Sequence, residues 1–203
     1  FDYELLIKSS LKAESDIQTD LNWLIDKELV VKMRHSDGNT YFFRHAMIRD
    51  AAHDRMSDKN SKDVHFRIAE SLIHEFPTRV DDNPYQVAKH KAGATQYEPA
   101  VNYGFKMINK LVARSSNAEA IKISTEIQSW IGVLDTEIAQ VEKELELVEH
   151  MLPVYTMISM WGKEQYESLT ERSFQLLNNY AKLTGESSDL YKYSAGRTEW
   201  MLF

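Results

Sequence analysis

The sequence predicts a mostly helical protein with one small two-stranded β-hairpin near its start. The chain has 203 residues but only 7 Gly and 4 Pro, so few residues interrupt helices. Apolar residues recur at intervals of three and four over most of its length, which is the spacing of helices with one buried face. The exception is residues 29–43, where two β-rich runs flank a turn.

The first part of the chain predicts the order helix, helix, hairpin. We expect helices over residues 2–9 and 14–28, strands over 29–34 and 40–43, and a turn at Asp37-Gly38-Asn39. The second helix should bury one stripe of apolar residues, formed by Ile17, Leu21, Leu24 and Ile25. This order of elements is typical of a winged-helix unit, which we assign to residues 1–57.

A strand runs directly into a helix at the end of this unit. Tyr41-Phe42-Phe43 is short and aromatic, whereas helical spacing begins at His45. Arg44 and His45 therefore lie at a helix N-terminus, where backbone N–H groups attract anions.

The rest of the sequence predicts helices. Residues 58–96 should form a helical linker or arm, with helices over 59–76 and 85–92, a stop at Pro77, a polar loop at 81–84, and Pro84 at a first helical position. Residues 97–203 should form helix pairs, predicted over 98–113 with 117–133, 136–161 with 163–183, and 186–203 opening a third pair. The second helix of the first pair begins as tetratricopeptide helices usually do, and Gly104 and Ala120 would let that pair approach closely. We therefore expect an α-α superhelix that resembles tetratricopeptide repeats.

Composition narrows the class of function. The net charge of -7 disfavours a general nucleic-acid binder, which would more often be basic. The sequence has no Cys, no leader-like start and no apolar run of membrane-spanning length, so we expect a cytoplasmic protein without a membrane segment. The absence of an initiator Met and the apolar ending at residues 200–203 lead us to expect a piece excised from a longer protein.

Several phrases, taken in order, resemble one family. They are Phe43-Arg44-His45-Ala46-Met47-Ile48-Arg49-Asp50-Ala51-Ala52, His65-Phe66-Arg67-Ile68-Ala69-Glu70-Ser71-Leu72, Val87-Ala88-Lys89-His90, Ala100-Val101-Asn102-Tyr103 and Ala113-Arg114-Ser115-Ser116-Asn117-Ala118-Glu119-Ala120-Ile121. Together they resemble bacterial signal-transduction ATPases with numerous domains (STAND ATPases), in the branch where an NTPase module precedes a winged helix and a tetratricopeptide array. Such regulators also carry a cyclase, a kinase or a LuxR-type domain.

The resemblance implies a regulatory, non-catalytic piece. The chain lacks the glycine-rich phosphate loop that ends in Lys and Ser or Thr, so we expect no enzyme activity and no cofactor in this piece. ATP or ADP with Mg would be held by an NTPase module upstream in the same chain. The resemblance makes His45 a candidate sensor of the nucleotide phosphates, with Arg44 and Arg49 as helpers. A protein or a small-ligand inducer would bind the helical array.

Plainer interpretations remain open beside this one. His45 could be a helix cap or a packed core histidine, and Arg49 could simply pair with Asp50. The remaining histidines considered lie scattered along helices, without metal-ligand spacing. They are His53, His65, His74 and His90. Four glutamates, Glu142, Glu144, Glu146 and Glu149, predict a solvated helix face. The chain could also be a plain protein-binding scaffold, or a DNA-binding regulator, although the acidic helix before the hairpin argues against DNA.

Overall fold

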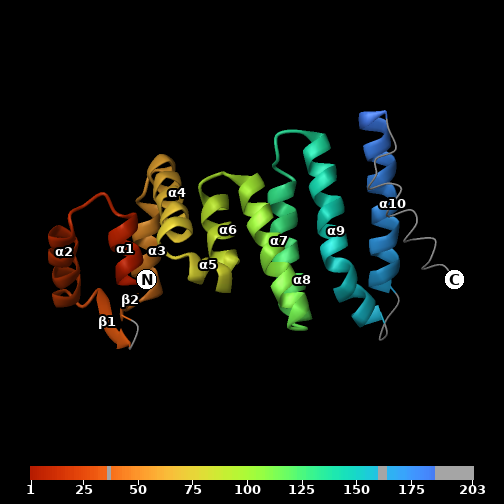
Figure 1. Cartoon of the computed structure of the whole chain (residues 1–203). Helices are drawn as coiled ribbons and strands as arrows, with labels where there is room; N and C mark the ends of the chain where they lie inside the picture. Colours follow the sequence, from red (N-terminus) through yellow and green to blue (C-terminus); the bar gives the residue numbers. More distant parts are fainter. Residues whose placement is uncertain (36–37, 160–163, 186–203) are drawn as a thin grey trace. The chain divides into compact units, whose positions relative to one another are not determined.

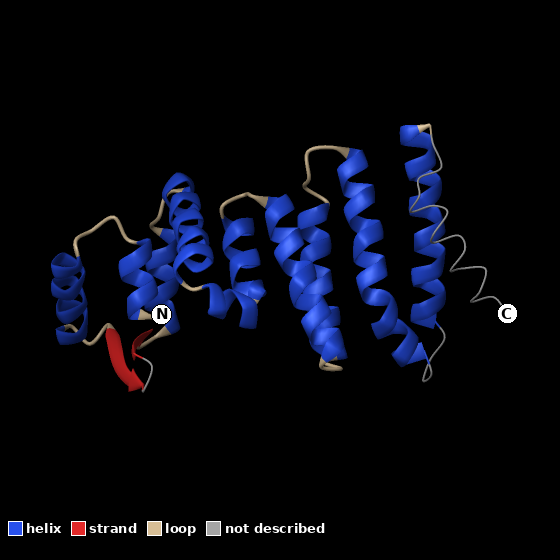
Figure 2. Ribbon diagram, in the orientation of Figure 1, coloured by secondary structure: helices blue, strands red, loops and turns tan. Residues whose placement is uncertain are grey.

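The computed structural model describes residues 1–35, 38–159 and 164–185. Within these residues the chain is mostly helical, with ten helices and a two-stranded antiparallel sheet (Figures 1 and 2), which confirms the predicted fold class. The chain divides into two compact units, residues 1–96 and residues 97–203.

Six helices and the hairpin form the described part of the first unit. They are α1 (Tyr3–Ser9), α2 (Glu14–Asp26), β1 (Val30–His35), β2 (Gly38–Phe43), α3 (Ala46–Asp54), α4 (Asp58–Glu75), α5 (Pro77–Asp82) and α6 (Pro84–Gly93). The side chains of Asp2 and Ser57 cap α1 and α4 by accepting N–H bonds from the first turn. Pro77 and Pro84 begin α5 and α6, where a missing N–H costs nothing.

The hairpin shares a small core with α1 and α2. β1 and β2 pair in register from Val30 opposite Phe43 to His35 opposite Gly38. Four buried residues make the centre of this core, and they are Ile17, Leu21, Val30 and Tyr41. The predicted turn is partly corrected, because Gly38 and Asn39 belong to β2, while Asp37 lies outside the described residues.

Helix α4 holds the rest of the first unit together. It packs against α1 and α6, and residues 58–96 lie in the same compact unit as residues 1–57. The Lys91 ammonium on α6 pairs with the Glu70 carboxylate on α4 and also donates to Gln96 Oε1 at 2.9 Å. Pro77 ends α4 as predicted, but it also starts α5, so part of the polar loop expected at residues 81–84 is helical.

The second unit is a row of helices. Its described members are α7 (Tyr97–Ala113), α8 (Asn117–Ile131), α9 (Glu137–Ser159) and α10 (Glu164–Thr184). Helix α8 packs on α7, α9 packs on both of them, and α10 packs on α9 (Figure 1), which is how paired-helix repeats stack. Gly104 lets α7 and α8 approach closely, because a Cβ there would lie 2.6 Å from Ile127 Cδ1.

Two predictions for the second unit cannot be followed in the structure. The helix expected over residues 186–203 and the break expected at Gly162 both lie outside the described residues. Among the described helices, none combines the length and the apolar content that crossing a membrane requires.

Candidate functional site

The first candidate site is the junction, which we define as Arg44 and His45 between β2 and α3. The Arg44 backbone N–H donates to Leu29 O at 2.9 Å, and its guanidinium Nη1 lies 3.2 Å from Glu28 Oε2. His45 occupies the position that precedes α3, but its exposed side chain makes no capping hydrogen bond. His45 is thus the cap residue of α3 by position but does not cap the helix with its side chain, and its exposure does not fit a packed core residue.

The helix that follows the junction is uncovered. Helix α3 buries none of its residues, and Met47 is 82% exposed. Arg49 pairs with its neighbour, with Nη2 at 2.8 Å from Asp50 Oδ1, as the local interpretation predicted. Both arginines of the candidate set thus have a carboxylate partner, whereas the His45 imidazole makes no hydrogen bond or ion pair with the described residues; the His45 backbone carbonyl accepts from Ile48 N–H at 3.1 Å.

The junction has the chemistry of a weak anion site. The first N–H groups of an α-helix have no partner within the helix, and they carry partial positive charge. The Arg44–Glu28 and Arg49–Asp50 pairs are exposed to solvent, so each stabilises the fold by at most about 1 kcal/mol. An anion such as a phosphate could therefore replace the carboxylate partner of one of these guanidinium groups at a small cost in free energy.

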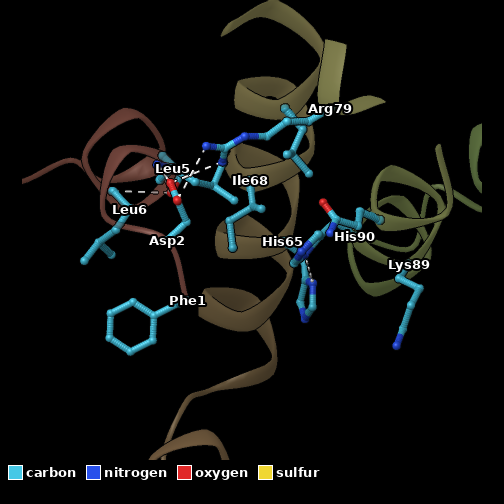
Figure 3. Close-up of a pocket in the computed structure, with 12 residues that line it drawn as sticks. Phe1, Asp2, Leu5, Leu6, His65, Ile68, Arg79, Lys89 and His90 are labelled. Atoms are coloured by element: carbon cyan, nitrogen blue, oxygen red, sulfur yellow. Dashed lines mark hydrogen bonds and ion pairs between the residues drawn. The ribbon is translucent and has the colours of Figure 1, made fainter. Parts of the chain in front are cut away.

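The second candidate site is a cavity of about 820 Å³ within the first unit, lined by α1, α4, α5 and α6 (Figure 3). Apolar side chains from α1 and α4 form much of its wall, and they are Leu5, Leu6, Ile68 and Leu72. The polar residues of its lining are Asp2, Ser9, Arg79, Gln86, Lys89 and two histidines. This volume lies within the usual range of small-molecule pockets.

Two histidines meet across this cavity. Nδ1 of His65 on α4 lies 2.9 Å from Nδ1 of His90 on α6 (Figure 3). A hydrogen bond between two such atoms needs one protonated and one unprotonated Nδ1, so the two rings are not both charged when it forms. Burial lowers the pKa of His65, and the charge of His53 lowers it further. Burial, followed by His65 and Lys89, lowers the pKa of His90 to about 4.

A glycine makes room for this pair. A Cβ on Gly93 would lie 2.6 Å from Cγ and Nδ1 of His65, so a side chain at that position would displace the ring. The sequence interpretation missed the pair because it took these histidines as scattered. A signal existed, since His65 shares a helix face with Ile68 and Leu72, and Gly93 follows His90 by one helical turn.

The cations of this cavity differ in their surroundings. Arg79 contacts the Asp2 carboxylate through both terminal nitrogens, at 3.2 Å and 3.5 Å, and it also approaches Glu4 at 3.9 Å. Lys89 is exposed and has no ion pair among the described residues. The charge of Arg79 is thus compensated in place, whereas that of Lys89 is not.

The structure corrects the expected solvated face of α9. Glu142, Glu144, Glu146 and Glu149 are half-buried rather than solvated. Arg172 on α10 binds Glu144 in a two-pronged pair, with Nε–Oε1 at 2.8 Å and Nη2–Oε2 at 2.9 Å. Glu142 and Glu144 therefore join α9 to α10, since the Tyr180 hydroxyl also donates to Glu142 Oε1 at 3.2 Å.

Metal binding has little support within the described part of the chain. In residues 1–35, 38–159 and 164–185 no three His, Asp or Glu side chains gather where they could hold one ion. The pair of His65 and His90 provides two nitrogens without a third protein ligand.

The chain matches no known protein family, no curated protein and no solved structure.

Proposed function

We propose that this chain is a non-catalytic regulatory part of a signal-transduction ATPase of the STAND class. The winged-helix unit would respond to ATP or ADP with Mg held by an NTPase module of the same chain, and His45 would touch the phosphates. The observation that carries the proposal is the junction itself, where the exposed His45 imidazole makes no side-chain hydrogen bond and lies directly before the uncovered helix α3.

Electrostatics favours phosphate at this place. The N-terminus of α3 offers backbone N–H groups and a partial positive charge. Arg44 and Arg49 flank His45 in sequence, and their present carboxylate partners hold them only weakly in solvent. A phosphate would gain charge-assisted hydrogen bonds, which are about twice as strong as neutral ones.

The uncovered apolar surface of α3 supports packing against another module. Met47 lies in α3 and is 82% exposed, and Met56, two residues beyond its end, is 37% exposed, although α3 has the apolar spacing of a packed helix. A docked module would bury these side chains at roughly 25 cal/mol per Å². The NTPase module would then lie over α3 with its nucleotide facing His45.

The helix row of the second unit would receive the signal. Stacked helix pairs present extended surfaces on which proteins or small ligands bind. An inducer that prefers one arrangement of the complete protein would shift the balance between closed and open states by its difference in affinity.

The test is ADP release from the full-length protein that contains this chain. His45→Ala should speed ADP release about tenfold, because one charge-assisted contact is lost. His53→Ala is the matched control, since His53 is equally exposed but lies in the last turn of the same helix. Unchanged ADP release in His45→Ala would remove the sensor role.

A plain protein-binding scaffold is the second candidate, and the stacked helix pairs favour it. Capture of partners from lysate in the presence of ADP and of ATP separates the two functions, because a scaffold should hold the same partners with both.

DNA binding has less support. The exposed side of α2 carries Glu14, Asp16, Asp20 and Asp26, which phosphates repel, so we expect no salt-dependent shift of duplex DNA.

A further inference from the structure

We propose that the cavity between α1, α4, α5 and α6 binds a small amphipathic carboxylate, with its apolar body on the aliphatic wall and its head at Lys89. The inference does not rest on the proposed nucleotide response, because the cavity and the junction share no residue. Leu5, Leu6, Ile68, the histidine pair and Lys89 are among the residues that line the cavity, and Figure 3 labels them.

The wall of the cavity selects an apolar body. Leu5 and Leu6 of α1 lie across from Ile68 and Leu72 of α4, and all four are aliphatic. Leu72 is only 1% exposed, so this side of the cavity reaches the core of the unit. A volume of about 820 Å³ accommodates a chain of several carbon atoms. Burial of each CH₂ group would add roughly 0.8 kcal/mol to binding.

The charges of the cavity select an anion with a single charge. Arg79 is already balanced by Asp2, whereas Lys89 has no carboxylate within one helical turn, because Tyr85, Gln86, Ala92 and Gly93 occupy those positions. The single uncompensated ammonium of Lys89 can pair with the one carboxylate of such a ligand. A phosphate with two charges would need a second free cation, and the neutral histidines do not supply one.

The histidine pair supplies a neutral donor beside that ammonium. In either arrangement of the shared proton, one of the two rings carries its other hydrogen on Nε2. That N–H can donate to a carboxylate without bringing a second charge into the cavity. The low pKa of His90 agrees with this, since burial, His65 and the nearby Lys89 ammonium all favour the neutral ring.

Titration of the 203-residue chain with sodium octanoate tests the proposal. We expect saturable binding by calorimetry, together with shifts of the His65 and His90 imidazole signals in NMR spectra. Octanol has the same alkyl chain as octanoate but no charge, and it should bind at least fivefold more weakly than octanoate. Acetate has the carboxylate of octanoate without its long alkyl chain, and it should show no saturable binding.

Two variants change the head site without touching the wall. Lys89→Gln removes the ammonium, and Gln86→Glu places a competing carboxylate one helical turn from Lys89. Both positions are exposed, so both variants should fold. Each should weaken octanoate binding about fivefold or more. The controls Lys62→Gln and Gln18→Glu make the same charge changes at exposed positions outside the cavity, and they should bind as the wild type does.

Three results would overturn the proposal. They are absence of saturable octanoate binding, octanol binding as tight as octanoate binding, and unchanged affinity in both Lys89→Gln and Gln86→Glu.

Discussion

His65 and His90 link the stability of the first unit to pH. Both have a pKa below the ordinary value of about 6.5, chiefly because of burial. Above pH 6.5 the rings are neutral in the folded and the unfolded chain, so the full stability is present. As the pH falls from 6.5 toward 4, the unfolded chain takes up protons that the folded chain refuses, and stability falls.

We therefore predict that the free energy of unfolding decreases between pH 7 and pH 5, by about 1 kcal/mol for His90 after allowance for its partial exposure, and that His65 adds to the decrease. Urea titrations at both pH values measure it. In His90→Asn the side chain can still form a hydrogen bond but does not titrate, so the free energy of unfolding of this variant should depend less on pH. His45→Asn, at an exposed position, should retain the wild-type dependence. Equal slopes in wild type and His90→Asn would contradict the prediction.

Glu70 and Glu75 offer a matched pair of acidic residues on α4. Glu70 binds the buried Lys91, and this hydrogen bond is the main reason that the Glu70 pKa is lowered. Glu75 binds Lys8 at 3.0 Å with both side chains about half exposed. Because a buried ammonium left without its partner is costly, Glu70→Gln should lower the free energy of unfolding by about 1–2 kcal/mol.

Chemical denaturation at pH 7 measures this effect. Glu75→Gln should change the free energy of unfolding by less than about 0.5 kcal/mol, since exposed pairs contribute little. An equal loss of unfolding free energy in the two variants would show that the burial of Lys91 does not explain the contribution of the Glu70–Lys91 pair to stability.

At the scale of elements, the contact between α7 and α8 depends on one missing side chain. A Cβ on Gly104 would lie 2.6 Å and 2.7 Å from Cδ1 and Cγ1 of Ile127, well inside van der Waals contact. Gly104→Ala must therefore push the two helices apart or force Ile127 from its rotamer. We expect the free energy of unfolding to fall by about 1–3 kcal/mol.

Gly132, at the end of α8, is the control for this substitution. A Cβ there would meet only backbone oxygens at 3.7 Å, and its φ of -63° suits any residue. Gly132→Ala should be neutral, or should stabilise by up to about 1 kcal/mol through the unfolded chain. Thermal unfolding of both variants gives the comparison, and a Gly104→Ala variant as stable as wild type would refute the close approach.

At the scale of the whole molecule, the chain consists of two units that each have their own core. The first unit, residues 1–96, contains the hairpin core, the α4 packing and the whole cavity. A chain of this size can bury enough apolar surface to fold alone. The second unit has a separate cluster on α9 and α10, formed by Val141, Leu145, Leu176 and Leu177.

We predict that residues 1–96 fold when expressed alone. Circular dichroism should show a helical spectrum and a cooperative thermal transition. The imidazole signals of His65 and His90 should match those in the full chain, because their partners all lie within the fragment. A fragment without a cooperative transition would mean that the first unit needs residues beyond 96.

The sequence by itself determined the elements, because their causes are local. Periodic apolar residues predicted α2, α4, α7 and α8 within a few residues, Pro84 marked the start of α6, and the two β-rich runs predicted the hairpin. Gly104 was also foreseen as a point of close approach, since a small residue on an apolar stripe indicates one.

The tertiary structure alone decided which polar groups meet. His65 and His90 are 25 residues apart, and Arg172 reaches Glu144 over 28 residues, so no local pattern links them. The glutamates of α9 carry the spacing of a solvated face, yet they are half-buried, and Glu142 and Glu144 contact α10. Side-chain partners depend on how helices pack in three dimensions, whereas helix positions depend on residues within one or two turns.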